Sequence, residues 1–370
     1  MADDVVFDAP KKKFTLTYDE LKIEGVANFN KLSELYERSI TLDYPTGLWL
    51  AGQSTVSNRY IMSQYDMDGR KINELDLQKT LELGNSQVFG MSTYDLSNGN
   101  ALYIKAGILL DGDRNWSANI FLDKKTNRIN WKSKSDSGRI PIFSFKNGNI
   151  LLFTPSRALY TADGSNVIGR IPEKTYIENA KDSVLLPLDI PPWSGMLKLG
   201  NTVLLNYGDF IQSVNELGKI TNISAKLPSF ASAMPGTSGL ATSLGGFFCT
   251  PSRKKVSQLT TQEGKRTKIT RPRSLNMYYY DEGAGKIYNL GNTGEIAPYV
   301  EITEGDKEID QTRYQGDVAV VTETGDYYEV MWDKVGINVY HSAANQAVLK
   351  KRLEQAISDD KNFVHLKKKN

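Results

Sequence analysis

The sequence contains very little cysteine and histidine. Its 370 residues include one cysteine, Cys249, and two histidines, His341 and His365. A single cysteine excludes an intrachain disulfide framework and a cysteine-built metal site. Two histidines near one end of the chain do not favour hydrolase or metal-oxidase centres, which need imidazoles from several parts of the fold. We therefore predict no metal, no cofactor and no catalytic residue, and we interpret Cys249 as a small buried apolar residue.

Long apolar runs and nucleotide-binding motifs are also missing. No stretch approaches the roughly 18 apolar residues of a membrane-spanning helix. The first residues, MADDVVFDAP, carry acids where a secretory signal needs positive charge. The sequence has no glycine-rich phosphate loop, no nucleophile elbow and no dinucleotide fingerprint. We expect a protein without membrane contact that stays in a cytoplasm, or leaves it by lysis or assembly.

What the sequence does contain is a pattern of short strands. Between Arg139 and Ile171, four apolar runs of four to six residues alternate with turn signals such as Asn147-Gly148 and Asp163-Gly164. Asn-Gly and Asp-Gly pairs supply the positive φ angles of tight hairpins. This segment therefore predicts a four-stranded antiparallel meander.

Two turn signals of this kind recur in the same order along the chain. The first precedes an apolar strand at six places, at or beside Gly47, Gly99, Gly148, Gly200, Gly246 and Gly316. The intervals are 46 to 52 residues, except for the last, which is 70. This period, with four short strands per unit, is typical of β-propellers, and the chain resembles that fold over residues 40–342. We predict an all-β, six-bladed β-propeller of four-stranded antiparallel blades; a β-sandwich is the alternative.

The first strand of each predicted blade would face a central channel. These segments are Thr41–Tyr44, Phe89–Tyr94, Ile142–Phe145, Met196–Lys198, Ala241–Ser243 and Gln311–Tyr314. Their mixture of apolar and neutral polar residues with scattered charges does not resemble a catalytic centre.

Extensions flank the predicted propeller on both sides. Residues 1–39 form a predicted N-terminal arm with a strand at Phe14–Thr17 and a short helix near Asn30–Tyr36. Residues 343–370 contain a predicted amphipathic helix from Ala343 to Ile357, followed by a basic tail. We expect one face of this helix to bind a partner through Leu349, Leu353 and Ile357.

The charge is nearly balanced overall, with 45 Lys and Arg against 43 Asp and Glu, but residues 251–274 are strongly basic. Their only acid is Glu263, and their eight basic residues are Arg253, Lys254, Lys255, Lys265, Arg266, Lys268, Arg271 and Arg273. Because the long 70-residue interval contains this segment, we predict a loop inserted into a blade. Such a loop is suited to bind nucleic acid or an acidic protein surface; a solvated hairpin without a partner is the alternative.

The style of the sequence resembles that of bacteriophage virion components, with few cysteines and histidines, many Asn, Ser and Tyr, no export signal, and extensions at both ends. This resemblance implies a tail, hub or capsid-associated protein. We expect a non-enzymatic structural or assembly protein whose partners are other virion subunits, located in the virion or, before assembly, in the host cytoplasm.

Two other functions stay open. One is a cytoplasmic scaffold. The other is a carbohydrate-binding or glycan-acting propeller, with tryptophans as stacking platforms. The candidate platforms are Trp49, Trp116, Trp131, Trp193 and Trp332.

Overall fold

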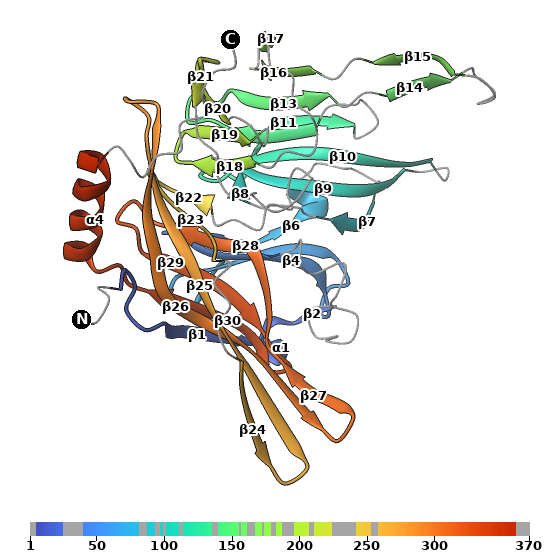
Figure 1. Cartoon of the computed structure of the whole chain (residues 1–370). Coiled ribbons are helices and arrows are strands. Elements are labelled where there is room, and N and C mark those ends of the chain that lie inside the picture. The colour runs from blue at the N-terminus through green and yellow to red at the C-terminus, as the bar shows by residue number, and fades with distance from the viewer. Residues whose placement is uncertain are drawn as a thin grey trace.

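The computed structural model describes residues 5–24, 40–80, 87–92, 97–98, 101–110, 114–134, 140–154, 157–160, 167–171, 174–178, 183–186, 196–206, 211–223, 242–252 and 258–359. These residues are mostly strands (Figure 1). The helices among them are α1 (Tyr18–Leu21), α3 (Leu77–Thr80) and α4 (Gln346–Asp359). Within this part of the chain, no helix is long and apolar enough to cross a membrane.

Three sheets come from the first half of the chain. The first contains β2 (Ile23–Glu24), β3 (Ile40–Asp43), β4 (Gly47–Ser54), β5 (Tyr60–Tyr65) and β6 (Lys71–Asp76). The second contains β7 (Gln87–Ser92), β8 (Ser97–Asn98), β9 (Ala101–Leu110), β10 (Arg114–Asp123) and β11 (Ile129–Lys134). The third contains β12 (Ile140–Ser144), β13 (Ile150–Thr154), β16 (Lys174–Glu178) and β17 (Ser183–Leu186).

Two further sheets complete the described structure. The nine-stranded sheet runs in the order β1 (Lys11–Thr17), β30 (Gly336–Ser342), β29 (Tyr327–Trp332), β28 (Arg313–Val321), β22 (Thr242–Ser243), β18 (Met196–Leu199), β19 (Thr202–Asn206), β20 (Ile211–Asn215) and β21 (Ile220–Ile223). The last contains β23 (Phe247–Pro251), β24 (Leu259–Glu263), β25 (Arg266–Asp281), β26 (Lys286–Glu304) and β27 (Lys307–Gln311).

The predicted number of six separate blades is wrong, because the described residues form five sheets of four or more strands. Two antiparallel meanders, β18–β21 and β28–β30, share one sheet. The short strand β22 joins them, since it pairs in parallel with both β18 and β28. The joined strands β18, β22 and β28 therefore all run in the same direction.

The predicted meander at Arg139–Ile171 also needs correction. Its last two runs form β14 (Arg157–Tyr160) and β15 (Val167–Ile171), which pair with each other as a separate hairpin. The edge of β13 is taken by β16 instead, with Leu151 opposite Ile177. The turn at Asn147-Gly148 does connect β12 to β13 as expected.

Successive sheets pack face to face through clusters of buried apolar side chains. One cluster joins the first two sheets through Trp49, Met62 and Ile104. Another joins the first sheet to the β28–β30 meander through Leu48 and Val330. Antiparallel meanders that pack in sequence and meet again at the two ends of the chain define an all-β propeller.

The N-terminal strand β1 is part of this closure. It runs antiparallel to β30, with Leu16 opposite Ile337 and Phe14 opposite Val339. The strand predicted at Phe14–Thr17 is therefore present, but residues 11–17, which we expected in an arm outside the blades, belong to the last meander. The predicted helix near Asn30–Tyr36 lies outside the described residues.

Candidate functional site: a projecting sheet and an axial cavity

Strands β25 and β26 are much longer than the other strands. They have 16 and 19 residues, against a usual strand length of about 5–6. Their pairing extends from Asp281 opposite Lys286 to Arg266 opposite Glu304. At the far end, Gly264 has a φ of 61° and allows a tight turn into β24, while β27 pairs with β26 on the other side. Residues 258–271 and 299–312 thus form a four-stranded sheet, here called the projecting sheet.

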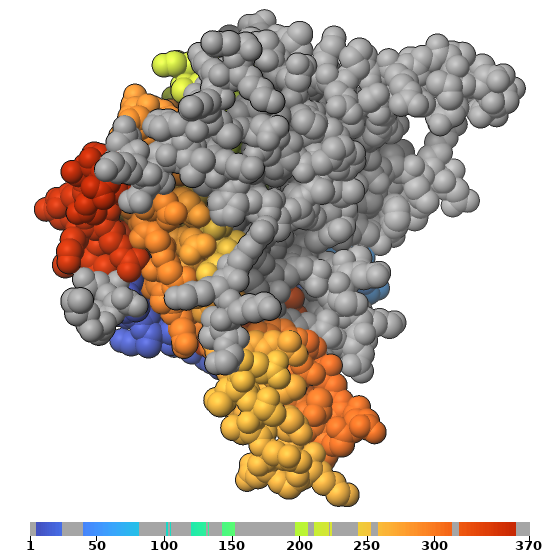
Figure 2. Space-filling model, in the orientation of Figure 1, coloured from blue at the N-terminus to red at the C-terminus, as the bar shows by residue number. Residues whose placement is uncertain are grey.

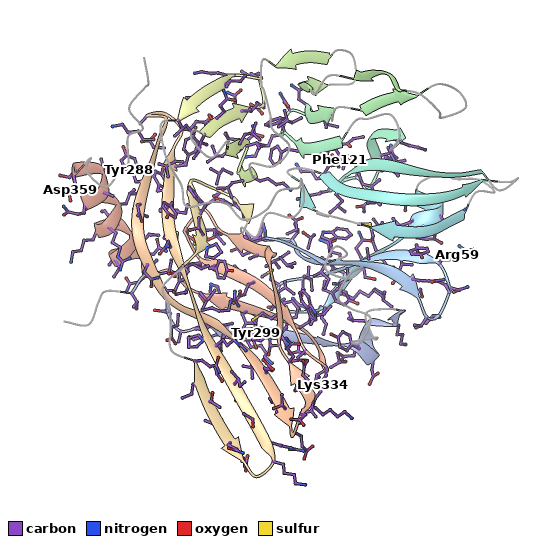
Figure 3. The ribbon with its side chains drawn as sticks, turned by 45° about the vertical axis from the view of Figure 1, so that its right-hand side comes forward. Arg59, Phe121, Tyr288, Tyr299, Lys334 and Asp359 are labelled. Atoms are coloured by element: carbon purple, nitrogen blue, oxygen red, sulfur yellow. The ribbon has the colours of Figure 1, made fainter. Side chains whose placement is uncertain are left out.

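The projecting sheet extends from the lower edge of the molecule in Figure 1, and Figure 2 shows its outer end beyond the body. None of its residues is buried, and all five residues of β24 are exposed. The side chain of Tyr299, labelled in Figure 3, is only half-buried. A sheet normally packs at least one face on a core, and within the part of the chain that the structure describes this sheet lacks that cover.

A buried ion pair fixes the base of the projecting sheet to the last meander. The Arg273 Nη2 atom of β25 lies 2.8 Å from Glu329 Oε2 of β29, and the Glu329 side chain is 2% exposed. Arg273 also donates to the Ala297 carbonyl, and the Tyr327 hydroxyl donates to Glu329. Burial raises the pKa of Glu329, while the Arg273 guanidinium and the Tyr327 hydroxyl offset part of that rise. Arg273, which we expected to bind a partner, therefore has a structural role.

The other predicted basic residues divide into two groups. Arg253, Lys254 and Lys255 lie outside the described residues. The remaining four, Lys265, Arg266, Lys268 and Arg271, lie on the projecting sheet. The predicted loop is thus regular β-structure at this end.

Two ion pairs cross from β25 to β26 within the projecting sheet. Arg271 Nη2 lies 3.3 Å from Glu301 Oε2, and Arg266 Nε lies 4.0 Å from Glu304 Oε1. Both pairs join strands that are already neighbours, and both arginines are more than half exposed. At such exposure each pair contributes about 0–1 kcal/mol, so they do not determine the fold.

The C-terminal helix is present as α4, but its apolar face packs on the protein itself. Leu349 is 2% exposed and Leu353 is partly buried, in a cluster with Val6 and Tyr288. Arg352 donates to the carbonyls of Leu290 and Asn292 on β26. Figure 3 shows α4 beside the part of β26 that carries Tyr288.

The packing of α4 changes the role of its predicted partner-binding residues. Leu349 is not available to a partner, because the side chain lies in the protein's own core. Of the three apolar residues expected to bind, Ile357, which is 48% exposed, is the most open. The tail after Asp359 lies outside the described residues.

A cavity of about 510 Å³ lies where the ends of β3, β12, β18, β22 and β28 meet. Its lining includes an ion pair between Asp43 Oδ1 and Lys124 Nζ at 2.8 Å, together with Lys198 and Ser144. The Ser144 hydroxyl has no hydrogen-bond partner among the described residues. Four of the six segments predicted to face the channel contribute to this lining, namely Thr41–Tyr44, Ile142–Phe145, Met196–Lys198 and Ala241–Ser243.

The tryptophan platforms of the glycan-binding alternative are partly accounted for. Trp49 and Trp332 are 1% and 2% exposed, so both belong to the core and cannot stack on a sugar. Trp193 lies outside the described residues, and the side chains of Trp116 and Trp131 are not described. None of the described residues that line the cavity is a tryptophan, a histidine or a cysteine.

No protein-family model matches the sequence, and no curated protein matches it. Among solved structures, the chain is similar to the β-propeller domain of the Trilobed protease from Pyrococcus furiosus, with 8% identity, a TM-score of 0.29, and coverage of 66% of this chain and 78% of that one. It is similar to the WD40 domain of SCAP from fission yeast, with 8% identity, a TM-score of 0.25, and coverage of 84% and 74%. It is also similar to puromycin hydrolase, with 11% identity, a TM-score of 0.28, and coverage of 79% and 49%. Similarities at this level say nothing about activity or partners.

Proposed function

We propose that this propeller is a non-enzymatic interaction protein that uses the projecting sheet as its docking surface. The observation that supports this most is that residues 258–271 and 299–312 form four paired strand segments beyond the body, and that none of these residues is buried. A partner that covers this sheet would supply the packing that the rest of the described residues does not provide.

The anchoring of the sheet supports the same function. Beyond the base, β25 and β26 continue into the core, where Met277 is fully buried and Tyr278 is 5% exposed. The buried pair of Arg273 and Glu329 adds a second attachment. A docking surface held in one orientation loses little conformational entropy on binding, which favours affinity.

The finer parts of the proposal rest on the sequence alone. The absence of enzymatic activity is inferred from the scarcity of histidine and cysteine. A place in a bacteriophage particle is inferred from composition and from the terminal extensions, and the fold and the comparisons add no support for it. The docking function does not depend on either inference.

The test is to remove the projecting sheet and compare the complexes that form. In the variant, residues 258–271 and residues 299–312 are each replaced by an Asn-Gly turn, a sequence suited to two-residue hairpins. Full-length and shortened chains are expressed with the same affinity tag in the natural source and recovered under native conditions. We expect the full-length chain in complexes of higher mass that the shortened chain does not enter.

Cys249 supplies the folding control for this comparison. It is the only cysteine in the sequence and is 2% exposed, so a folded body keeps it unreactive toward a thiol reagent. If the shortened chain keeps Cys249 protected and still enters the same complexes, the projecting sheet is not the docking surface and the proposal is wrong.

A further inference from the structure

The axial cavity has the size of a small-molecule site. Its volume of about 510 Å³ lies within the range of roughly 300–1,000 Å³ that is usual for ligand pockets. It lies at the carboxyl ends of β3, β12, β18, β22 and β28, and residues of the turns after these strands contribute to its lining. Connections at the ends of a rigid scaffold are a common place for binding.

Four lysines among the described residues line this cavity, and they come from three different sheets. Lys124 and Lys125 follow β10 of the second sheet, and Lys146 follows β12 of the third. Lys198 lies on β18 of the nine-stranded sheet. Segments that are distant in the sequence thus bring amines to one place.

The acids of the described lining are fewer, and two of them already bind groups of the protein. They are Asp43, Asp123 and Glu323. Asp43 accepts from Lys124 Nζ and from the Thr46 hydroxyl, each at 2.8 Å. Asp123 accepts two backbone amides of its own turn, at 2.9 and 2.7 Å. Four lysines against three acids leave a surplus of positive charge, which favours an anion over a cation.

Two polar groups of the lining are buried. Lys198 is 8% exposed and Ser144 is 1% exposed. A lysine is rarely so buried unless its charge is compensated, and its ammonium has three donors to satisfy. The Ser144 hydroxyl has no hydrogen-bond partner among the described residues, although most buried polar side-chain atoms have one. An oxyanion in the cavity would supply an acceptor for both groups.

The turns around the cavity are bonded to one another. The Lys146 amide donates to Asn201 Oδ1 at 2.9 Å, and the Gly200 amide donates to the Ser243 carbonyl at 2.8 Å. Gly200 has a φ of 52°, and a Cβ at this position would lie 2.9 Å from the Leu244 carbonyl oxygen, so glycine permits this close approach. A site whose groups are held before binding loses little conformational entropy.

Part of the lining is apolar. Leu42, Phe143 and Val320 line the cavity and are buried. Since a water molecule takes up about 30 Å³ in the liquid, the cavity has room for far more than one small inorganic ion. The lining therefore fits an anion that also carries a carbon skeleton.

We propose that the axial cavity binds a small organic phosphate, with the phosphate group at the lysines and the carbon skeleton against the apolar side chains. Phosphate fits better than carboxylate, because amines from three sheets can each bond a different oxygen of a tetrahedral group, and lysine is a common phosphate ligand. This binding does not involve the projecting sheet and does not depend on the docking function.

The test is isothermal titration calorimetry of the full-length chain at pH 7 with inorganic phosphate, phenyl phosphate and benzoate. We expect one phenyl phosphate to bind per chain, about tenfold more tightly than inorganic phosphate, because its ring packs on apolar side chains. Benzoate has the same ring with a carboxylate, and we expect it to bind about tenfold less tightly than phenyl phosphate.

Four variants locate the site. Lys198→Met should weaken the binding of phenyl phosphate about tenfold or more, because it removes a buried charged donor. Lys146→Ala should weaken it about threefold, since this side chain is exposed. Lys219→Ala removes an exposed amine outside the cavity and should bind like the wild type. Ser144→Ala should weaken binding about threefold without lowering the free energy of unfolding of the unliganded chain, because the hydroxyl has no partner among the described residues.

The other outcomes overturn the proposal. If neither phosphate binds at concentrations up to about 10 mM, or if the cavity variants bind as tightly as Lys219→Ala, the cavity is not a phosphate site. Benzoate that binds as tightly as phenyl phosphate would exclude the phosphate group, and inorganic phosphate that binds as tightly would exclude the carbon skeleton. If Lys198→Met does not fold, the exposed Lys146 decides the result. The docking function is tested by complexes of the shortened chain, so either proposal can fail while the other stands.

Discussion

Breaking the buried ion pair at the base of the projecting sheet should have a large cost. In the Arg273→Met variant, the Glu329 carboxylate loses a partner at 2.8 Å in a position where its side chain is 2% exposed. Removing one member of a buried pair typically costs about 3–5 kcal/mol, because the remaining charge is left without compensation. We expect a loss of this size in the free energy of unfolding at neutral pH.

The pH dependence of that loss identifies its cause. Burial already raises the pKa of Glu329 above its ordinary value of 4.5, and loss of Arg273 removes a group that lowers it. A raised carboxyl pKa gives stability that is present below pH 4.5 and is lost as the pH rises through the folded-state value. The variant should therefore differ from the wild type by only about 1 kcal/mol near pH 4, the worth of a lost hydrogen bond, and by much more at pH 7.

The assay is denaturant unfolding at both pH values, monitored by the fluorescence of the buried side chains of Trp49 and Trp332. The double variant Arg273→Met with Glu329→Leu is the matched control. Because it leaves no buried charge, most of the lost stability should return. An Arg273→Met variant that loses less than about 1 kcal/mol at pH 7, or loses the same amount at both pH values, would refute the reasoning.

Three further predictions concern the rest of the fold. Leu349→Ala should lower the free energy of unfolding by about 2–5 kcal/mol, because the side chain is 2% exposed. Ile357→Ala on the same helix should lower it by less than about 0.5 kcal/mol, and equal losses would contradict the packing of α4. Gly336→Ala should release β1, because an added Cβ would lie 2.1 Å from the Leu16 carbonyl oxygen; limited proteolysis that leaves residues 5–17 intact would contradict this closure. The Arg70 amide donates to Asp66 and lowers the pKa of that carboxyl, so the carboxylate's contribution to the stability of the fold is present above pH 3.8 and is lost as the pH falls further. Asp66→Asn should therefore make the free energy of unfolding less dependent on pH on the acid side, and an unchanged pH dependence would exclude the effect.

Local turn chemistry made the class of fold predictable. Pairs such as Asn147-Gly148 fix a hairpin through the conformations they allow, so short strands and their antiparallel order follow from neighbouring residues. The count of sheets depends on contacts between distant segments. Strand β22 has two residues and joins two meanders through pairing with β18 and β28, which leaves no local signal in the sequence.

The candidate site was found only in part, for the same reason. The basic residues from Lys265 to Arg271 marked the right segment, but we preferred an inserted loop to a hairpin, which was the alternative. Thr267, Ile269 and Thr270 favour β-structure. The partner of Arg273 is Glu329, 56 residues further along the chain. The only sequence sign of that pair was an acid within the apolar run Tyr327–Trp332. Residues 299–312, the second part of the projecting sheet, carried no motif in the sequence.

The most direct test of the docking function is hydrogen exchange of the protein within its native assembly, compared with the isolated chain. We predict that amides of residues 258–271 and 299–312 exchange more slowly in the assembly, because a partner covers the open edges of the projecting sheet. Unchanged exchange in these residues, together with slower exchange on another surface of the propeller, would contradict the account.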